Sequence, residues 1–321
     1  DPAVVTGKLP NGMTYYIRKN AKPEKRLELR LVVNAGSVLE DEDSRGIAHF
    51  CEHMAFNGTE RFKKHELTNY LESIGMRFGP ELNAYTGFDE TVYMLQVPTD
   101  SAGVVDTAFR ILDDWSRRVS YEDAEIDRER GVVVEEWRLG RGADSRIRDR
   151  QLPILLMDSR YADRLPIGKK EVIEKAPHDL FRKFYRAWYR PDLMAVIVVG
   201  DCDPPAMEKL IRDTFDSPVL SGQLSRTEFP VPDHDETLFA IATDPEATRS
   251  SVSVYWKRPI RIEKTVGQYR RTIVEALFNS ALNRRLDELA RLADPPFLSA
   301  YSAIGDLVRT KEVYVLGAGV K

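Results

Sequence analysis

Hydrophobic and polar residues alternate in several short stretches of the first 200 residues. Between residues 27 and 33, leucine or valine occupies every odd position, and two charged residues lie between them. This pattern predicts a β-strand with one buried face. Residues 13–20 predict another strand, and residues 83–98 predict two strands joined by a glycine turn. The continuous apolar run at residues 193–201 predicts a strand that is buried on both faces.

Other stretches have apolar residues at helical spacing. Residues 47–56 are mostly apolar around two histidines and a glutamate, which predicts a buried helix that ends at Asn57-Gly58. Residues 67–74 carry apolar side chains at positions i, i+3, i+4 and i+7, and we expect Gly75 to end that helix. Further helices are predicted at residues 103–119, 121–141 and 178–191.

The pattern of the chain changes after residue 216. Proline, serine and aspartate are frequent in residues 217–236, which predicts a linker between a first domain at 1–216 and a second at 237–321. The second domain has only about 85 residues and repeats the strand-strand-helix order of the first. We therefore expect it to be an incomplete homologue of the first, and the chain to be a fragment. Its predicted elements are strands at 237–244, 251–259 and 312–319 and a helix at 267–293.

Composition narrows the range of functions. The chain has 321 residues and a net charge of -4, which argues against a nucleic-acid partner because such proteins favour a basic patch. It has no run of about 18 apolar residues, so no membrane span is expected. Cys51 and Cys202 do not make a disulfide framework, and Cys51 is expected to be a packed thiol in its apolar helix.

The most informative stretch is His-Phe-Cys-Glu-His at residues 49–53. Side chains at i and i+4 share one face of a helix, so His49 and His53 point the same way, and Glu52 lies beside them. Two imidazoles one turn apart can bind one zinc ion, and a neighbouring carboxylate can take a proton from a zinc-bound water. The alternative is a pair of hydrogen-bonded core histidines, but burying three polar groups would require partners for all of them.

A catalytic zinc site needs a third protein ligand. Glu129 and Glu136 are seven residues apart, which places them on one face of the helix predicted at 121–141. The alternative is a pair of surface carboxylates beside Arg128 and Arg130, and spacing alone leaves both interpretations open. Glu135 is expected to be a solvated residue.

Several motifs in order resemble one enzyme family. H-x-x-E-H is followed by LNAYT, DETVYMLQVP, a pair E-x6-E and FYRAWYRPDLMAVIVVGD. This order is similar to the pitrilysin/insulinase family of zinc metallopeptidases, the inverzincins, and most similar to its bacterial processing-peptidase-like branch. The resemblance covers residues 5 to about 215 and continues more weakly beyond them.

The resemblance implies roles for individual residues. His49, His53 and Glu136 would bind one zinc ion per chain, and Glu52 would be the general base. Glu129 would contact and orient one of these ligands rather than bind the zinc ion itself. Residues Asn83, Ala84 and Tyr85 would form an edge strand that pairs with the backbone of the substrate.

The resemblance also implies a fold and a function. The fold would be α+β, with repeated two-layer domains of mostly antiparallel sheet and helices on one face. The function would be a zinc endopeptidase acting on unfolded peptides, with residues 1–216 as the catalytic domain and the second domain non-catalytic. The family needs a far half, here the missing C-terminal part or a homologous subunit, so the 321 residues alone would be weakly active. A bacterial, periplasmic location is favoured over a cytoplasmic one.

Two other functions remain open. Some members of the family are non-catalytic scaffold or partner subunits, but such relatives usually lack some of the motif residues that are intact here. A metal-binding module without hydrolysis is the other possibility, and Glu52 argues against it.

Overall fold

The computed structural model describes the whole chain except residues 75, 78, 80, 102, 220–224 and 321. The chain divides into two compact units: unit 1 contains residues 1–139 and 164–227, and unit 2 contains residues 140–163 and 228–321. The predicted domain boundaries stay a prediction; the compact units differ from them in that residues 140–163 group with the second unit. The predicted helix end at Gly75 and part of the predicted linker lie outside the described residues.

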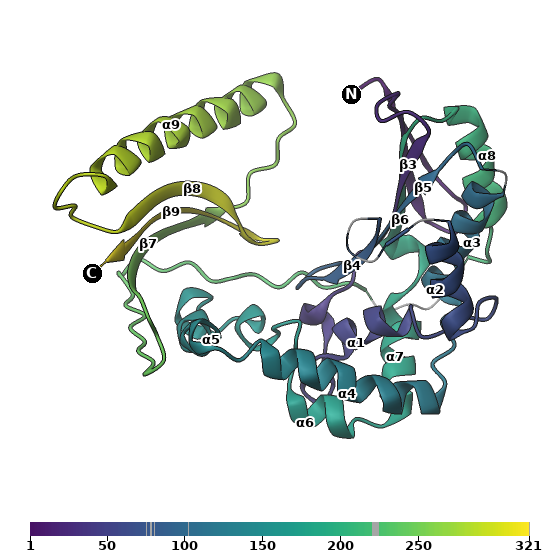
Figure 1. Cartoon of the computed structure of the whole chain (residues 1–321), viewed down its shortest axis with the longest axis horizontal. Coiled ribbons are helices and arrows are strands. Elements are labelled where there is room, and N and C mark those ends of the chain that lie inside the picture. Colours follow the sequence, from purple (N-terminus) through teal and green to yellow (C-terminus); the bar gives the residue numbers. More distant parts are fainter. Residues whose placement is uncertain (75, 78, 80, 102, 220–224, 321) are drawn as a thin grey trace. The chain divides into compact units, whose positions relative to one another are not determined.

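Unit 1 is built on one mixed six-stranded sheet (Figure 1). The strand order is β1-β2-β6-β3-β5-β4, and every neighbouring pair is antiparallel except β2 and β6. The last strand in this order, β4, forms one edge of the sheet. The strands are β1 (Val4–Lys8), β2 (Thr14–Lys19), β3 (Arg26–Val33), β4 (Leu82–Thr86), β5 (Thr91–Pro98) and β6 (Met194–Gly200).

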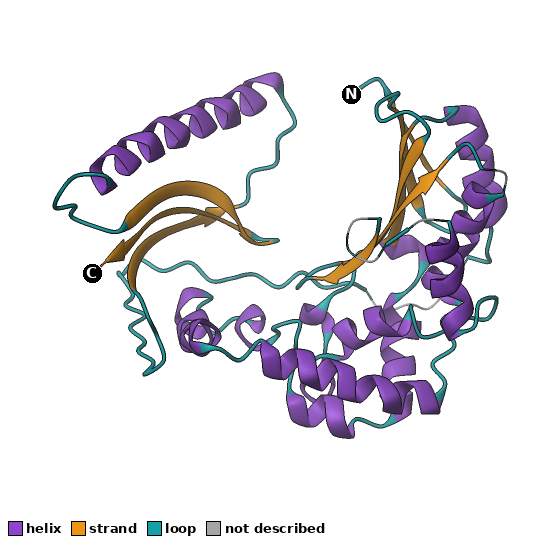
Figure 2. Ribbon diagram, in the orientation of Figure 1, coloured by secondary structure: helices purple, strands orange, loops and turns teal. Residues whose placement is uncertain are grey.

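Helices of unit 1 form two groups. Helix α3 packs against β3 and β5, and α8 packs against β2 and α3, so these two helices cover the sheet (Figure 2). The second group contains α4, α6 and α7. Helix α1 contacts α4 and α7 of this group as well as β4 and β5, so it lies where the edge of the sheet meets these helices. The helices are α1 (Ile47–Met54), α2 (Lys64–Ser73), α3 (Val104–Arg117), α4 (Asp123–Leu139), α6 (Lys170–Lys175), α7 (His178–Trp188) and α8 (Pro204–Thr214).

The alternating pattern of residues 27–33 predicted the centre of this sheet correctly. Leu27, Leu29 and Leu31 are fully buried on one face of β3 and lie opposite Val97, Leu95 and Tyr93 of β5. The prediction that the run at 193–201 is buried on both faces is wrong. Buried and half-buried residues alternate along β6, because only one face of the sheet there is fully covered.

Unit 2 contains a three-stranded antiparallel sheet in the order β7-β9-β8, with α9 packed against β8. The predicted strand at 237–244 is wrong: these residues form no regular structure, and their side chains are mostly exposed. The long helix and the other two predicted strands are present. The elements are α5 (Ala143–Leu155), β7 (Ser250–Pro259), α9 (Val266–Ala290), β8 (Ser299–Val308) and β9 (Lys311–Val320).

Both units join a sheet to helices, which confirms the predicted α+β class. Among the described residues, none of the helices combines the length and the apolar character that a membrane crossing requires.

Candidate metal centre

Helix α1 carries three of the predicted site residues on one side. It begins after Gly46, whose φ of 102° lies in the left-handed region that favours glycine. The buried carboxylate of Glu40 accepts hydrogen bonds from the backbone N–H groups of Gly46 (3.0 Å) and Ala48 (2.8 Å). Acceptor oxygens at the N-terminus of a helix satisfy backbone donors that have no partner within the helix, so the side chain of Glu40 fixes the start of α1.

Two histidines of α1 converge with a glutamate of α4. The imidazole centroids of His49 and His53 are 4.7 Å apart. Nε2 of His49 lies 3.6 Å from one carboxylate oxygen of Glu136, and Nε2 of His53 lies 3.4 Å from the other. One donor atom from each of the three residues lies within 4.8 Å of the others, a spacing that could hold a metal ion.

Glu129 lies behind His53. Its Oε1 is 2.8 Å from Nδ1 of His53, and its Oε2 accepts a hydrogen bond of 2.8 Å from the side-chain amide of Asn57. Its side chain is 11% exposed. The neighbouring arginines have other partners, since Arg128 pairs with Glu125 and Arg130 with Asp127. Glu129 is therefore a buried carboxylate that faces an imidazole, and the surface alternative does not describe it.

Glu52 is buried beside the histidines. Thr86 of β4 donates a hydrogen bond of 2.6 Å to its carboxylate. Burial raises the pKa of Glu52, and the Thr86 hydrogen bond opposes that shift only in part. A buried carboxyl with a raised pKa holds a proton more readily than one in water.

The two imidazoles have opposite shifts. Burial, together with the nearby charge of His53, lowers the pKa of His49 to about 4. Burial also lowers the pKa of His53, but its contacts with Glu129 and Glu136 outweigh burial and raise the pKa to about 9. The contact with His53 in turn lowers the pKa of Glu136. The site thus concentrates negative charge around two imidazoles, which suits a cation.

The two histidines, Glu52 and Glu136 line a pocket of about 440 Å³ at the edge of the sheet. Asn83 lies on β4 but its side chain is exposed and does not line the pocket. Glu135 is exposed and pairs with Arg138 at 2.6 Å, away from the histidines, as expected of a solvated residue. The lining residues are His49, Glu52, His53, Ala84, Tyr85, Thr86, Glu136, Pro166 and Ile167.

Sequence reasoning did not identify four residues of this neighbourhood. Thr86 is the last residue of the LNAYT motif, so its position in the motif was available as a signal. Asn57 was noted only as part of a helix end. Pro166 and Ile167 lie in a segment without a recognisable motif, and only the folded chain brings them to the pocket.

The donor set fits zinc. Zinc in proteins prefers imidazole nitrogens and carboxylate oxygens, and catalytic sites use three such ligands. Because Nδ1 of His53 contacts Glu129, its Nε2 is the nitrogen left to face Glu136. Within the described part of the chain, the buried Nδ1 of His49 has no hydrogen-bond partner.

Two family models match the chain. One, described as Insulinase (Peptidase family M16), matches residues 15–149, and the other, described as Peptidase M16 inactive domain, matches residues 175–293.

Named relatives and a solved structure are also similar. The zinc protease PQQL-like of Arabidopsis thaliana is 41% identical over 304 residues, which are 94% of this chain and 32% of that protein. The probable zinc protease PqqL of Escherichia coli strain K12 is 34% identical over 290 residues, 89% of this chain and 31% of that protein. The crystal structure of the first half of the periplasmic protease PqqL from Escherichia coli has a TM-score of 0.89 at 30% identity, covering 100% of this chain and 69% of that one. The chain spans about a third of the length of these curated relatives.

Proposed function

Since this chain belongs to the insulinase family of peptidases, M16, we propose that it carries the zinc site and general base of an endopeptidase for unfolded peptides. The chain is a homologue of zinc proteases of that family. The observation that carries the proposal is the convergence of His49, His53 and Glu136 with the carboxylate of Glu52 in one pocket.

The three converging side chains would hold one zinc ion. When bound, zinc would supply Lewis-acid activation of water and of the scissile carbonyl. Glu129 would hold the imidazole of His53 through Nδ1, which fixes the ring so that Nε2 faces the ion. The intact set of residues favours an enzyme over a non-catalytic scaffold.

Glu52 is the proposed general base. It would accept a proton from the attacking water and deliver it to the nitrogen of the leaving amine. A base works best when its pKa lies near the operating pH, and burial moves the pKa of Glu52 upward in that direction. The hydrogen bond from Thr86 leaves the second carboxylate oxygen of Glu52 available for the proton.

Edge strand β4 is the proposed substrate platform. Among the residues that the structure describes, β4 pairs with β5 on one side and with no strand on the other, so the free side of Asn83, Ala84 and Tyr85 can accept an extended peptide by strand addition. Backbone pairing reads no particular sequence, which fits a broad range of unfolded peptides as substrates. Tyr85 is 45% exposed and would contact the side chains of the bound peptide.

We also propose a bacterial, periplasmic location, supported by the similarity to the periplasmic protease PqqL. The relatives are about three times as long as this chain. We propose that further chain, or a homologous subunit, covers the pocket during cleavage and that the 321 residues alone cleave weakly.

The test combines metal analysis with a peptidase assay. We expect about one zinc per chain in the purified protein, and cleavage of an unfolded peptide library by the full-length protein that a chelator abolishes. The variant Glu52→Gln should keep zinc and lose cleavage. Absence of bound zinc, or cleavage that resists both the chelator and Glu52→Gln, would refute the proposal.

A further inference from the structure

Asn57, in the loop that leaves α1, has a buried amide to which the proposed mechanism gives no role. Asn57 is only 6% exposed. Nδ2 donates to Oε2 of Glu129 at 2.8 Å and to the carbonyl of His53 at 3.1 Å. We propose that Asn57 is a positioning residue, which sets the orientation of the Glu129 carboxylate and, through it, of the His53 imidazole. This inference rests on the proposed function in that His53 is taken as a zinc ligand.

Glu129 needs a second partner to hold one orientation. It comes from α4, whereas His53 comes from α1, so a single hydrogen bond would leave the carboxylate free to rotate about it. Oε1 faces Nδ1 of His53, and Oε2 faces the Asn57 amide. With both oxygens occupied, the plane of the carboxylate is fixed. The direction of the Nδ1 contact then follows from the position of Asn57.

Asn57 is itself held firmly at the end of α1. Its backbone N–H donates to the carbonyl of Met54 at 3.0 Å. The next residue, Gly58, has a φ of 122°, and its carbonyl accepts hydrogen bonds from the backbone N–H (3.1 Å) and the hydroxyl (3.0 Å) of Ser120. The indole N–H of Trp115 donates to the carbonyl of Ala55 at 2.9 Å. The backbone on both sides of Asn57 is therefore tied to the end of α3 and the segment that follows it.

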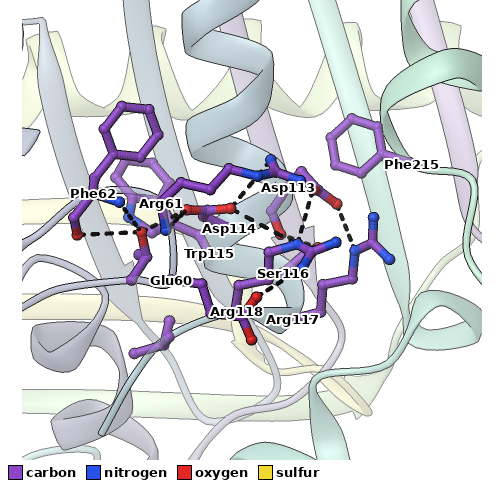
Figure 3. Close-up of polar contacts among 12 residues, drawn as sticks. Glu60, Arg61, Phe62, Asp113, Asp114, Trp115, Ser116, Arg117, Arg118 and Phe215 are labelled. Carbon is purple, nitrogen blue, oxygen red and sulfur yellow. Dashed lines mark hydrogen bonds and ion pairs between the residues drawn. The ribbon is translucent and has the colours of Figure 1, made fainter. Parts of the chain in front are cut away.

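A buried ion cluster anchors the rest of this loop to α3 (Figure 3). Asp113 and Asp114 have no exposed side-chain surface. Asp114 accepts a hydrogen bond of 2.5 Å from the Thr59 hydroxyl and one of 3.2 Å from the backbone N–H of Arg61. Asp113 pairs with the guanidinium groups of Arg61 (2.9 Å) and Arg117 (2.6 Å).

This cluster resists movement of the loop. A buried carboxylate that loses its partner is strongly destabilising, because its charge then lacks compensation. Any displacement of residues 59–61 would separate Asp114 from Thr59 and Arg61, and Asp113 from Arg61. The cluster therefore gives Asn57 a fixed support from which to orient Glu129.

A purely structural role is the competing interpretation. Asn57 would then only satisfy the His53 carbonyl at the end of α1, and its loss would lower stability without acting through Glu129. A double-mutant cycle separates the two, because residues that act through each other have non-additive effects.

The experiment measures zinc affinity of the 321-residue chain by competition with a chromophoric chelator. Direct partners of ligating histidines typically contribute about 10–100-fold to metal affinity. Asn57 is one hydrogen bond further away, so we expect Asn57→Ala to weaken zinc binding by about 3–10-fold, and Asn57→Asp, which keeps the shape but not the donor, at least as much. In a Glu129→Gln background, Asn57→Ala should change the affinity by less than about twofold.

Asn11 provides a matched control. It is also 6% exposed, and its Nδ2 donates two hydrogen bonds of 2.8 Å, to the carbonyl of Phe215 and the hydroxyl of Ser217. Neither acceptor lines the pocket. Asn11→Ala should therefore lower the free energy of unfolding about as much as Asn57→Ala, and leave zinc affinity unchanged.

Three outcomes would overturn the inference. These are unchanged zinc affinity in folded Asn57→Ala and Asn57→Asp, an equal loss in the wild-type and Glu129→Gln backgrounds, and an equal loss in Asn11→Ala. A second readout needs no metal: Asn57→Ala should shift the ¹⁵N resonance of His53 Nδ1 in the metal-free chain, and Asn11→Ala should not. If the wild-type chain binds no zinc but Asn57→Ala still shifts the His53 Nδ1 resonance, the proposed function is refuted and the positioning contact is established.

Discussion

Replacing Glu136 with glutamine tests the third ligand directly. The substitution keeps the shape of the side chain and removes its negative charge. The carboxylate oxygens of Glu136 lie 3.6 Å and 3.4 Å from Nε2 of His49 and His53, so it is the group that closes the set of three donors. Zinc binding should fall sharply in this variant.

The size of the expected loss in zinc affinity follows from the charge of Glu136 and from how exposed its side chain is. Two unit charges about 4 Å apart attract each other by about 4 kcal/mol at the effective dielectric of a protein surface, about 20. That dielectric suits Glu136, whose side chain is 52% exposed. A zinc ion carries two charges and would lie closer than 4 Å, so about 4 kcal/mol is a lower limit for the lost attraction. We expect zinc affinity to fall at least about 1,000-fold.

Glu135 is the matched control. It is the adjacent residue of α4, its side chain is also 52% exposed, and it pairs with Arg138 on the surface. Such surface pairs typically contribute about 0–1 kcal/mol, so Glu135→Gln should leave zinc affinity unchanged. The assay is chelator competition on both variants. Affinity retained within about tenfold in Glu136→Gln, or a large loss in Glu135→Gln, would refute the assignment of the third ligand.

Three further predictions concern the base, the support of His53 and the start of α1. Glu52→Gln should retain zinc in elemental analysis and lower peptide cleavage by the full-length protein by at least about 10²–10⁴-fold; full activity would place the base elsewhere. Glu129→Gln offers one acceptor to two donors, so zinc affinity should fall by about 10–100-fold in chelator competition, and an unchanged value would contradict the role of Glu129. Burial raises the pKa of Glu40 from 4.5 to about 8, so the unfolded chain releases this proton first as pH rises. The free energy of unfolding of the wild type should therefore fall by about 1.4 kcal/mol for each unit that pH rises between 4.5 and 8. Urea titrations at several pH values should show this dependence in the wild type and not in Glu40→Gln.

Periodicity predicted the parts of unit 1 that depend on local pattern. The strand around residues 27–33 and helices α2 and α3 follow from the spacing of their apolar residues. The same spacing placed His49, Glu52 and His53 on one side of α1, because the geometry of a helix fixes that relation without any other part of the chain.

Contacts between distant segments were not predictable from such spacing. Residues 237–244 have the composition of a strand, but a strand requires a neighbour for its hydrogen bonds, and in the described part of unit 2 these residues have none. Strand β8 was missed because serine and glycine interrupt its apolar pattern; it is held by register with β9 along nearly its whole length.

The same limit applies to the site. Spacing left Glu129 open between a surface carboxylate and a buried one, and the decision depended on His53 and Asn57, more than 70 residues earlier. The roles of Thr86, Pro166 and Ile167 likewise arise from packing between segments that share no local pattern.

The position of β6 in the sheet has a consequence for the order of folding. Strands β2 and β3 do not pair with each other; β6 lies between them and pairs with both, although it follows β3 by about 160 residues. Contacts between residues so far apart in sequence form slowly, because a long loop must close first. During synthesis, the β3-β5-β4 part of the sheet, which lies beside His49 and His53, leaves the ribosome before β6 exists, so β2 and β3 cannot yet be joined into one sheet. A chain truncated before residue 194 would keep β4 and β5 beside the metal centre but would expose two unpaired strand edges, one on β2 and one on β3, that are prone to aggregation.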